Sequence, residues 1–231
     1  VVRARFFGNR IVKSAGNQPV NILDLGSGDC WFAEQLLPRL PFGSTITCCD
    51  INFTELDLST PTARGITKMR ELPDGRFHIV VLLDVIEHVE NDMDFLQANV
   101  RPKLAEGGMV LISVPAHPYL FSEHDQFLGH YRRYTRRQLL ATNNTMFTPH
   151  ENGYLFVSLA LVRLVQRLLP QNRDTDQQGV GSWTSGKPFT KLVTALLSID
   201  ALTSTALRRL RIHLPGLTVW VSSTGKVVKS Q

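Results

Sequence analysis

The 231-residue chain is poor in cysteine and contains no long uncharged apolar run. Its three cysteines are Cys30, Cys48 and Cys49, and their spacing matches no familiar metal site. The adjacent pair stands in a strand-like run and points to opposite faces, so we expect reduced, buried thiols and no metal ion. No stretch of about 18 uncharged apolar residues occurs, and the first residues contain no apolar signal core. These absences favour a cytoplasmic protein without a spanning helix.

Charge is distributed unevenly along the chain, whose formal net charge is +5. Residues 1–129 contain 11 Lys and Arg against 16 Asp and Glu, which gives −5. Residues 130–231 contain 14 against 4, which gives +10. A basic second half suits an anionic substrate, nucleic acid or an anionic membrane surface. A basic face that is merely solvated is the alternative.

Short apolar runs alternate with helix-like segments, and this pattern predicts a doubly wound α/β fold on a parallel sheet. Strands are expected at residues 20–26, 44–50, 66–69, 77–84, 109–114, 148–155 and 217–223. Helices are expected at residues 3–14, 30–37, 92–101, 136–143, 156–169 and 189–212. In the second helix, the expected core contacts are Trp31, Phe32, Leu36 and Leu37.

Residues 20–30, VNILDLGSGDC, form the segment around which the chain is organised. An apolar strand leads into a turn with Gly26 and Gly28, and a helix follows. Such a turn lets a ligand approach the backbone beside the unpaired N–H groups of a helix N-terminus. Asp50 ends the next strand, where a carboxylate can bind both ribose hydroxyls of a nucleoside. A solvated turn aspartate is the alternative for Asp50.

Two kinds of nucleoside ligand fit such a loop. A dinucleotide fold has G-x-G-x-x-G at its first turn, whereas Trp31 occupies the third glycine position here. A bulky indole there blocks the close contact of helix and strand, which argues against an NAD-dependent oxidoreductase. Asp24, two residues before the first glycine, suits a cationic ligand better than a pyrophosphate. S-adenosylmethionine (SAM) carries a sulfonium and an ammonium group and no phosphate.

With these motifs, the chain resembles the class I SAM-dependent methyltransferases. Residues 24–30, DLGSGDC, match the first motif of that family, with Cys30 in place of its usual last glycine. Residues 84–89, DVIEHV, match the motif after the fourth strand, and Gly107-Gly108 precedes the fifth. The resemblance implies a Rossmann-like, doubly wound seven-stranded sheet with a helical insertion before the last strand.

The resemblance further implies one methyltransferase domain over residues 1–231. It would comprise an N-terminal helix at 1–19, a SAM-binding core at 20–155, a helical substrate cover at 156–213, and a last strand with its tail at 214–231. The cofactor-binding positions that it implies are Asp24, Gly26, Ser27, Gly28, Cys30, Asp50, Ile51, Asp84 and Val85. In this arrangement the two glycines pass close to the methionyl part of SAM, and residues 84–88 flank the sulfonium. For the acid that usually meets the adenine, residues 66–72 offer Glu71 alone.

Methyl transfer to an O–H or N–H group needs removal of a proton, for which neutral imidazole is suited. The candidate bases are His88, His117 and His124, with His130 in reserve. A structural hydrogen bond is the alternative role for each of them. His117, His124 and His130 together with Asp125 have no metal-type spacing, so we expect no metal site.

Residues 130–134, HYRRY, are rich in groups that bind anions. Arginine forks and aromatic faces can hold a carboxylate or phosphate, which suggests substrate-binding roles for Tyr119, His130, Tyr131 and Arg132. The alternative is that the arginines pair internally, with Glu87, Glu123 or Asp125.

The expected acceptor is a small-molecule or lipid-like compound, with O-methylation slightly favoured over N- or C-methylation. The helix at 156–169 is too short to span a bilayer. It either roofs an apolar substrate, lies in a membrane interface with Arg163 and Arg167 at the headgroups, or simply covers the core. If this helix lies in the membrane interface, the protein would be cytoplasmic with peripheral contact at the inner membrane face.

Two other function classes compete with this hypothesis. The Asn/Asp-Pro-Pro-aromatic pattern expected for methylation of DNA bases is absent after the fourth strand, which argues against nucleic acid as substrate. A catalytically inactive binding protein with the methyltransferase fold is one alternative function. An RNA or protein methyltransferase is the other.

Overall fold

The computed structural model describes residues 1–168, 187–210 and 212–226. These residues form a seven-stranded sheet in the order β3-β2-β1-β4-β5-β7-β6. The strands are β1 (Asn21–Leu25), β2 (Thr45–Cys49), β3 (Ile66–Met69), β4 (Phe77–Leu83), β5 (Leu104–Pro115), β6 (Phe147–Leu155) and β7 (Thr218–Gly225). The first five pair in parallel, and β7 runs antiparallel between β5 and β6. The doubly wound, seven-stranded sheet predicted from the sequence is confirmed.

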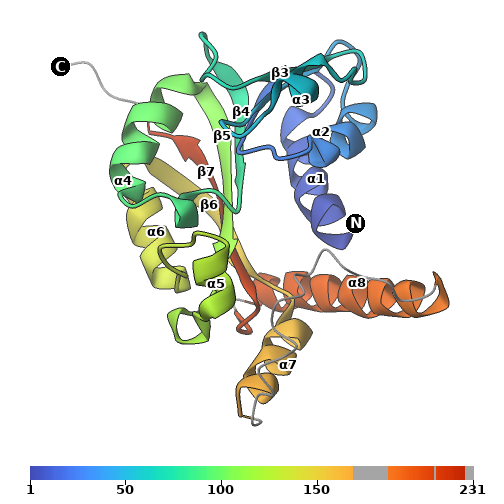
Figure 1. Cartoon of the computed structure of the whole chain (residues 1–231), viewed down its shortest axis with the longest axis vertical. Helices are drawn as coiled ribbons and strands as arrows, with labels where there is room; N and C mark the ends of the chain where they lie inside the picture. Colours follow the sequence, from blue (N-terminus) through green and yellow to red (C-terminus); the bar gives the residue numbers. More distant parts are fainter. Residues whose placement is uncertain (169–186, 211, 227–231) are drawn as a thin grey trace.

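Helices cover both faces of this sheet (Figure 1). On one face lie α1 (Val2–Ala15) and α2 (Trp31–Leu36), and on the other lie α4 (Asp92–Phe95) and α6 (Arg136–Asn144). The remaining helices are α3 (Glu55–Ser59), α5 (Glu123–Phe127), α7 (Val157–Leu168) and α8 (Lys187–Arg209). The last two stand between β6 and β7 in the sequence, so the predicted helical insertion before the last strand is present.

Alternation along the strands creates a buried core on each face of the sheet. Cys48 and Cys49 are both buried, and they belong to opposite cores, as predicted. In the core under α1, the fully buried Trp220 makes edge contacts with Phe6 and Phe7, at ring-centroid distances of 5.3 and 6.1 Å. A strand that is buried on both faces of the sheet consists of consecutive apolar residues. Such runs are conspicuous in the sequence, so these strands could be predicted from it.

Two expectations about individual elements are wrong. Trp31, expected in the core, is 39% exposed, because it is the first residue of α2 and lies beyond the end of β1. β5 begins at Leu104 and not at residue 109, since Leu104 already pairs with Phe77 before an irregularity in the β4–β5 register. Gly107 and Gly108 lie within β5. Because a Gly-Gly pair is typical of a turn, the start of the strand was expected after them.

The carboxyl ends of β1, β2, β4 and β5 lie at one edge of the sheet, called here the carboxyl edge. α5, α7 and α8 lie at this same edge, at the lower end of the molecule in Figure 1. In the part of the chain that the structure describes, no helix combines the length and hydropathy needed to cross a membrane. The expected roles of Arg163 and Arg167 fall on side chains outside the described ones.

Asp200 of α8 joins the two insertion helices. Its side chain is 8% exposed and accepts hydrogen bonds from the backbone N–H groups of Val157 and Ser158, at 3.1 and 2.7 Å. The Ser158 hydroxyl donates a third bond, at 2.5 Å. Val157 and Ser158 begin α7, so this carboxylate caps α7 from the neighbouring helix.

Replacing Asp200 with alanine leaves the first N–H groups of α7 without an acceptor. We expect Asp200→Ala to lower the free energy of unfolding by about 1–3 kcal/mol, measured by urea denaturation. Ser198→Ala is the matched control, because the Ser198 hydroxyl bonds only to the Thr194 carbonyl of its own helix among the described contacts. Equal stabilities of the two variants would contradict the capping role.

Candidate functional site

The glycine turn after β1 is held by close backbone contacts. Gly26 has a φ of +72° and donates its N–H to the Cys49 carbonyl at 2.7 Å. A Cβ at Gly26 would lie 2.6 Å from Cγ2 of Val85, so a side chain does not fit. A Cβ at Gly28 would meet nothing within 4 Å. The turn is therefore packed on one side and open on the other, where a ligand can approach its backbone.

Asp50 lies directly against this turn. Its Oδ2 accepts the Gly28 N–H at 2.8 Å, and its Oδ1 accepts the Asn52 N–H at 2.9 Å. Each carboxylate oxygen has two lone pairs, so each can still accept a ligand hydroxyl. Ile51, the next residue, is 83% exposed and presents an apolar side chain beside this carboxylate. Gly28, Asp50 and Ile51, all expected from the sequence to bind the cofactor, lie together in the structure.

Asp24 is a buried carboxylate beneath the turn. Its side chain is 3% exposed, and its Oδ2 has no hydrogen-bond partner among the described residues. Burial, with a smaller contribution from the negative charge of Asp50, raises the pKa of Asp24 to about 7. The Ser27 hydroxyl is likewise buried without a described partner, and the neighbouring Cys30 is a buried residue with a φ of +63°. Asp24 thus offers an unmatched acceptor to a cationic group.

Asp84 marks the end of β4 and is engaged by an arginine that the sequence analysis missed. Arg3 of α1 forms an ion pair with Asp84 and donates a second hydrogen bond to the Ser113 hydroxyl at 2.8 Å. Asp84 has a φ of +59°, so the chain turns sharply there, directly before Val85. The helical pattern of α1 was evident from the sequence, but nothing in it indicated that Arg3 reaches the tip of β4.

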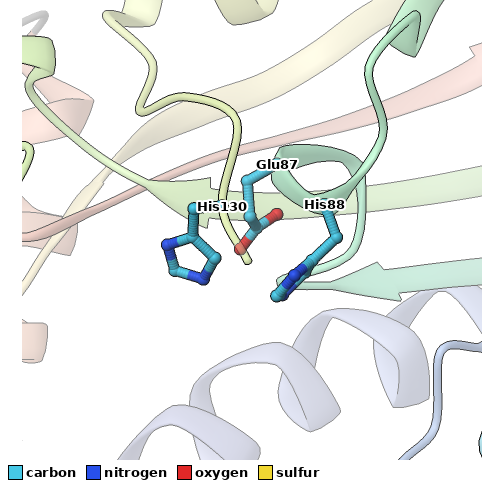
Figure 2. Close-up of side chains that lie close together, drawn as sticks. All are labelled: Glu87, His88 and His130. Atoms are coloured by element: carbon cyan, nitrogen blue, oxygen red, sulfur yellow. The ribbon is translucent and has the colours of Figure 1, made fainter. Parts of the chain in front are cut away.

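Glu87, His88 and His130 form a compact cluster at the carboxyl edge (Figure 2). Glu87 and His88 belong to η2 (Ile86–His88), which follows β4, and His130 follows α5. One potential ligand atom from each side chain lies within 4.8 Å of the other two. The rings of His88 and His130 meet edge to face, with centroids 4.6 Å apart. His130 therefore lies beside Glu87 and His88, although it is 42 or more positions away from them in the chain.

The electrostatics of the cluster are unusual. Glu87 is fully buried, and neither of its carboxylate oxygens has a hydrogen-bond partner on another described residue. Burial, and next the charge of Asp84, raises the pKa of Glu87 well above its ordinary value. The pKa of His88 is lowered by burial and by His130. From the sequence, Glu87 was expected within the segment 84–88 that flanks the sulfonium, and as a possible ion-pair partner for an arginine.

Asp125 organises the HYRRY segment from inside. Its buried Oδ1 is bonded to Nδ1 of His130 at 2.9 Å and accepts a hydrogen bond from Nε of Arg133 at 2.8 Å. Its Oδ2 accepts the Ser122 N–H at 2.9 Å. The pKa of Asp125 is lowered because these bonds and the charge of Arg133 outweigh the effect of burial. Arg133 therefore pairs internally with Asp125, one of the three partners considered from the sequence.

The other substrate-binding candidates of this segment are more accessible. Arg132 donates a hydrogen bond to the Glu90 carbonyl. Its Nη1 lies 3.8 Å from Oδ2 of Asp92, an ion pair that was not expected from the sequence. Tyr131 is 55% exposed, and its N–H donates to the Glu87 carbonyl at 2.8 Å. A cavity of about 490 Å³ lies beside both residues. It is lined by parts of α4, α6 and η5 (Pro118–Leu120) and by none of the glycine-turn residues.

His117 and Tyr119 lie in a separate aromatic group with Tyr154 of β6. The rings of His117 and Tyr154 stack at 5.3 Å with an interplanar angle of 13°, and Tyr119 is 5.2 Å from His117. Nε2 of His117 is buried without a described partner. The pKa of His117 is lowered, mainly by burial, so the ring is a neutral base. His124, on α5, joins neither this group nor the cluster of Figure 2 through any described contact.

Comparison with protein families gives one strong match. The family model described as a methyltransferase domain matches residues 3–195, which is most of the chain. None of the curated proteins matches the sequence.

Many solved structures share the fold. A SAM-dependent methyltransferase from Mesorhizobium loti superposes with a TM-score of 0.59 at 14% identity, covering 94% of this chain and 95% of that one. The N-methyltransferase NodS from Bradyrhizobium japonicum WM9 gives 0.53 at 14%, covering 96% and 95%. The 1,6-didemethyltoxoflavin-N1-methyltransferase from Burkholderia thailandensis, solved with its substrate and S-adenosylhomocysteine, gives 0.55 at 13%, covering 96% and 78%.

The raised pKa of Asp24 makes the stability of the folded chain depend on pH, and this dependence can be measured without any ligand. Because its pKa rises from 3.8 to about 7 on folding, the folded state loses stability as the pH increases between these two values and stays constant above them. We expect Asp24→Asn to match the wild type near pH 4 and to be more stable by about 4 kcal/mol at pH 8. Urea denaturation at several pH values measures the difference.

The exposed Asp74 supplies a matched control for this experiment, because its side chain lies in solvent in the β3–β4 turn. Asp74→Asn makes the same chemical change at an exposed site, 4.0 Å from Lys103, and its pH series gives the background for the comparison. A pH dependence of Asp24→Asn no larger than that of Asp74→Asn would contradict the raised pKa of Asp24.

Proposed function

The chain belongs to the methyltransferase-domain family, and we propose that it methylates a small apolar or lipid-like acceptor at the carboxyl edge of its sheet. It is a SAM-dependent methyltransferase with the Rossmann-like fold of that family. The observation that carries the donor site is the Asp50–Gly28 hydrogen bond, which sets a carboxylate against an open glycine turn at the tips of two neighbouring strands.

The residues at the turn fit SAM group by group. Asp50 would accept hydrogen bonds from the ribose hydroxyls, and Ile51 would pack against the base. The open backbone at Gly28 would lie along the methionyl part. Asp24, whose buried oxygen has no described partner, would face the cationic end of the ligand. A pyrophosphate would instead meet two buried or partly buried carboxylates here, so the charge of the site favours a cation.

SAM supplies an electrophilic methyl carbon: its bond to sulfur breaks as the bond to the acceptor atom forms, and the electron pair stays on sulfur. The chain would contribute alignment, because the turns at Gly26 and Val85 pack against each other. An O–H acceptor also has to lose a proton. Of the predicted bases we propose His117 for this role, since its buried Nε2 has no described hydrogen-bond partner and burial lowers its pKa, which favours the neutral ring.

The acceptor class is inferred from the insertion helices. Large apolar side chains of α7 and α8 are exposed, namely Leu161, Val162, Leu196, Ile199 and Leu202. Both helices lie at the carboxyl edge (Figure 1), which is also the edge that carries the proposed donor site. Exposed apolar surface at the same edge as a reaction site suits an apolar acceptor or contact with a lipid interface. A histidine base at this edge suits an acceptor that loses a proton on methylation, and of O–H and N–H groups we propose O–H as the acceptor.

Removal of the Asp50 carboxylate tests the donor site. We expect Asp50→Ala to weaken SAM binding more than about tenfold, because two hydrogen bonds to the ribose are lost. Isothermal titration calorimetry with SAM measures the effect, and NAD should give no heat. Asp74→Ala, which removes an exposed aspartate at the opposite edge of the sheet, should bind SAM like the wild type. Unchanged affinity in Asp50→Ala, or tight binding of NAD, would overturn the assignment.

The lipid-interface proposal has its own test. Leu202 on α8 and Leu56 on α3 are 70% and 74% exposed, so replacing either with aspartate makes the same chemical change at comparable exposure. We expect the wild type and Leu56→Asp to float with anionic vesicles at low salt, and Leu202→Asp to lose about two thirds or more of the floated fraction. Absence of wild-type flotation would contradict membrane contact and leave a freely diffusing acceptor.

A further inference from the structure

We propose that Glu87, His88 and His130 bind one divalent transition-metal ion, of the zinc class, at the carboxyl edge. Two imidazoles and one carboxylate are the donor set of several zinc and other transition-metal sites that keep a position open for a further ligand. Each of the three side chains offers an atom within 4.8 Å of the other two. Figure 2 shows the Glu87 carboxylate pointing between the two histidine rings.

The state of Glu87 is an independent reason to expect a cation. Its side chain is fully buried, and neither carboxylate oxygen has a hydrogen-bond partner on another described residue. A buried carboxylate without a partner is costly, and native proteins satisfy such groups with hydrogen bonds, ion pairs or metals. The nearest arginines serve other acids, since Arg3 pairs with Asp84 and Arg133 with Asp125.

His130 is held in the orientation that metal-binding histidines adopt. Its Nδ1 is bonded to the buried Asp125 at 2.9 Å, and this bond favours the neutral tautomer with the proton on Nδ1 and the lone pair on Nε2. A carboxylate that fixes the far nitrogen of a ligating imidazole is a common feature around protein metals. Asp125 is itself fixed by Arg133 and Ser122. The ring of His130 is therefore preorganised before any ion arrives.

The remaining adjustment falls on His88. Ligand atoms around tetrahedral zinc lie roughly 3.3 Å apart, given metal–ligand bonds of about 2.0–2.2 Å. The atoms of the cluster lie within 4.8 Å of one another, and His88 is its exposed member. We expect His88 to turn toward the ion on binding, away from the backbone of Leu128 and Gly129, while Glu87 and His130 stay in place.

The place of the cluster suggests what the ion would do. η2 follows Asp84 and Val85 directly, so the ion would lie beside the proposed position of the methyl donor. An acceptor hydroxyl in the open coordination position would be held in place, and its pKa would fall. This role rests on the proposed function, whereas the metal site itself rests only on the three side chains and Asp125.

Metal titration of the chelator-treated full chain tests the site. We expect calorimetry with Zn²⁺ to show one ion per chain with a Kd of about 10 µM or lower, and Co²⁺ to give the visible absorption of a nitrogen- and oxygen-bound ion. Mg²⁺ should bind about tenfold more weakly or worse, because imidazole suits transition ions. A failure of the wild type to bind Zn²⁺ and Co²⁺, or equal affinity for Mg²⁺, would overturn the proposal.

Variants separate this site from adventitious binding. Glu87→Gln and His88→Ala should each weaken Zn²⁺ binding about tenfold or more, and His88→Ala should fold normally because that side chain is exposed. His150→Ala is the matched control: it removes an exposed histidine of β6 outside the cluster, and it should bind Zn²⁺ like the wild type. Wild-type affinity in both cluster variants would refute the site.

The same variants keep this proposal distinct from the proposed function. SAM calorimetry on the metal-free wild type reports on the donor site alone, and Zn²⁺ calorimetry without SAM reports on the cluster alone. If SAM binds and Zn²⁺ does not, the metal proposal fails and the methyltransferase assignment stands. If Zn²⁺ binds and SAM does not, the proposed donor site fails and the metal proposal stands.

Discussion

The packing of Gly26 against Val85 is the constraint on which the carboxyl edge depends. With φ at +72° and only 2.6 Å available for a Cβ, position 26 admits glycine alone without a shift of the β4 turn. The contact brings the turn after β1 against the turn after β4. It also presents the Gly28 N–H to Asp50 at the end of β2. The ends of β1, β2 and β4 therefore form one surface, which is possible because Gly26 has no side chain.

Three buried carboxylates at the carboxyl edge, those of Asp24, Glu87 and Asp125, differ in their hydrogen-bond partners. Asp125 is saturated by His130, Arg133 and Ser122, and it holds the chain together. Asp24 and Glu87 each bury oxygens without a described partner. Both unmatched acids lower the stability of the folded chain at neutral pH, because burial of an unpaired charge opposes folding. Such a cost is recovered when a cation binds, so the unmatched acids mark where cationic ligands are expected.

The sequence predicted the strands and the glycine turn well for a local reason. A buried parallel strand is a continuous apolar run, and Ile66–Met69 was placed correctly from four residues. The helix expected at 136–143 is found as Arg136–Asn144, and the capping box of Thr135 and Gln138 at its start lies within a short window. The approach of Asp50 to Gly28 followed from the βαβ connection, which fixes the relation of neighbouring strand tips.

What the sequence could not predict depends on contacts across the fold. Arg3 reaches Asp84 from another element, and no periodicity in α1 distinguishes it from the other arginines there. The burial of Glu87 follows from the packing of η2 against the segment after α5, and charge statistics place glutamate at the surface. Trp31 was misplaced because helical spacing says nothing about where the helix begins relative to the sheet.

The HYRRY segment shows how composition and role can differ. Its arginines and tyrosines suggested an anion clamp, yet most of its polar groups are used inside the chain. Arg133 pairs with Asp125, and the Tyr134 hydroxyl donates to Asp92 at 2.8 Å. The backbone of Tyr134 bonds to Pro115 and His117, which ties the segment to the end of β5.

This internal bonding has a consequence for the site. A segment fixed at Arg133 and Tyr134 carries His130 to a set position beside Glu87, 43 residues earlier in the chain. The rigidity that would hinder an adaptable anion clamp is what a preorganised ligand needs. The basic, aromatic character of the segment is therefore best explained by its internal bonds, which fix the position of one histidine.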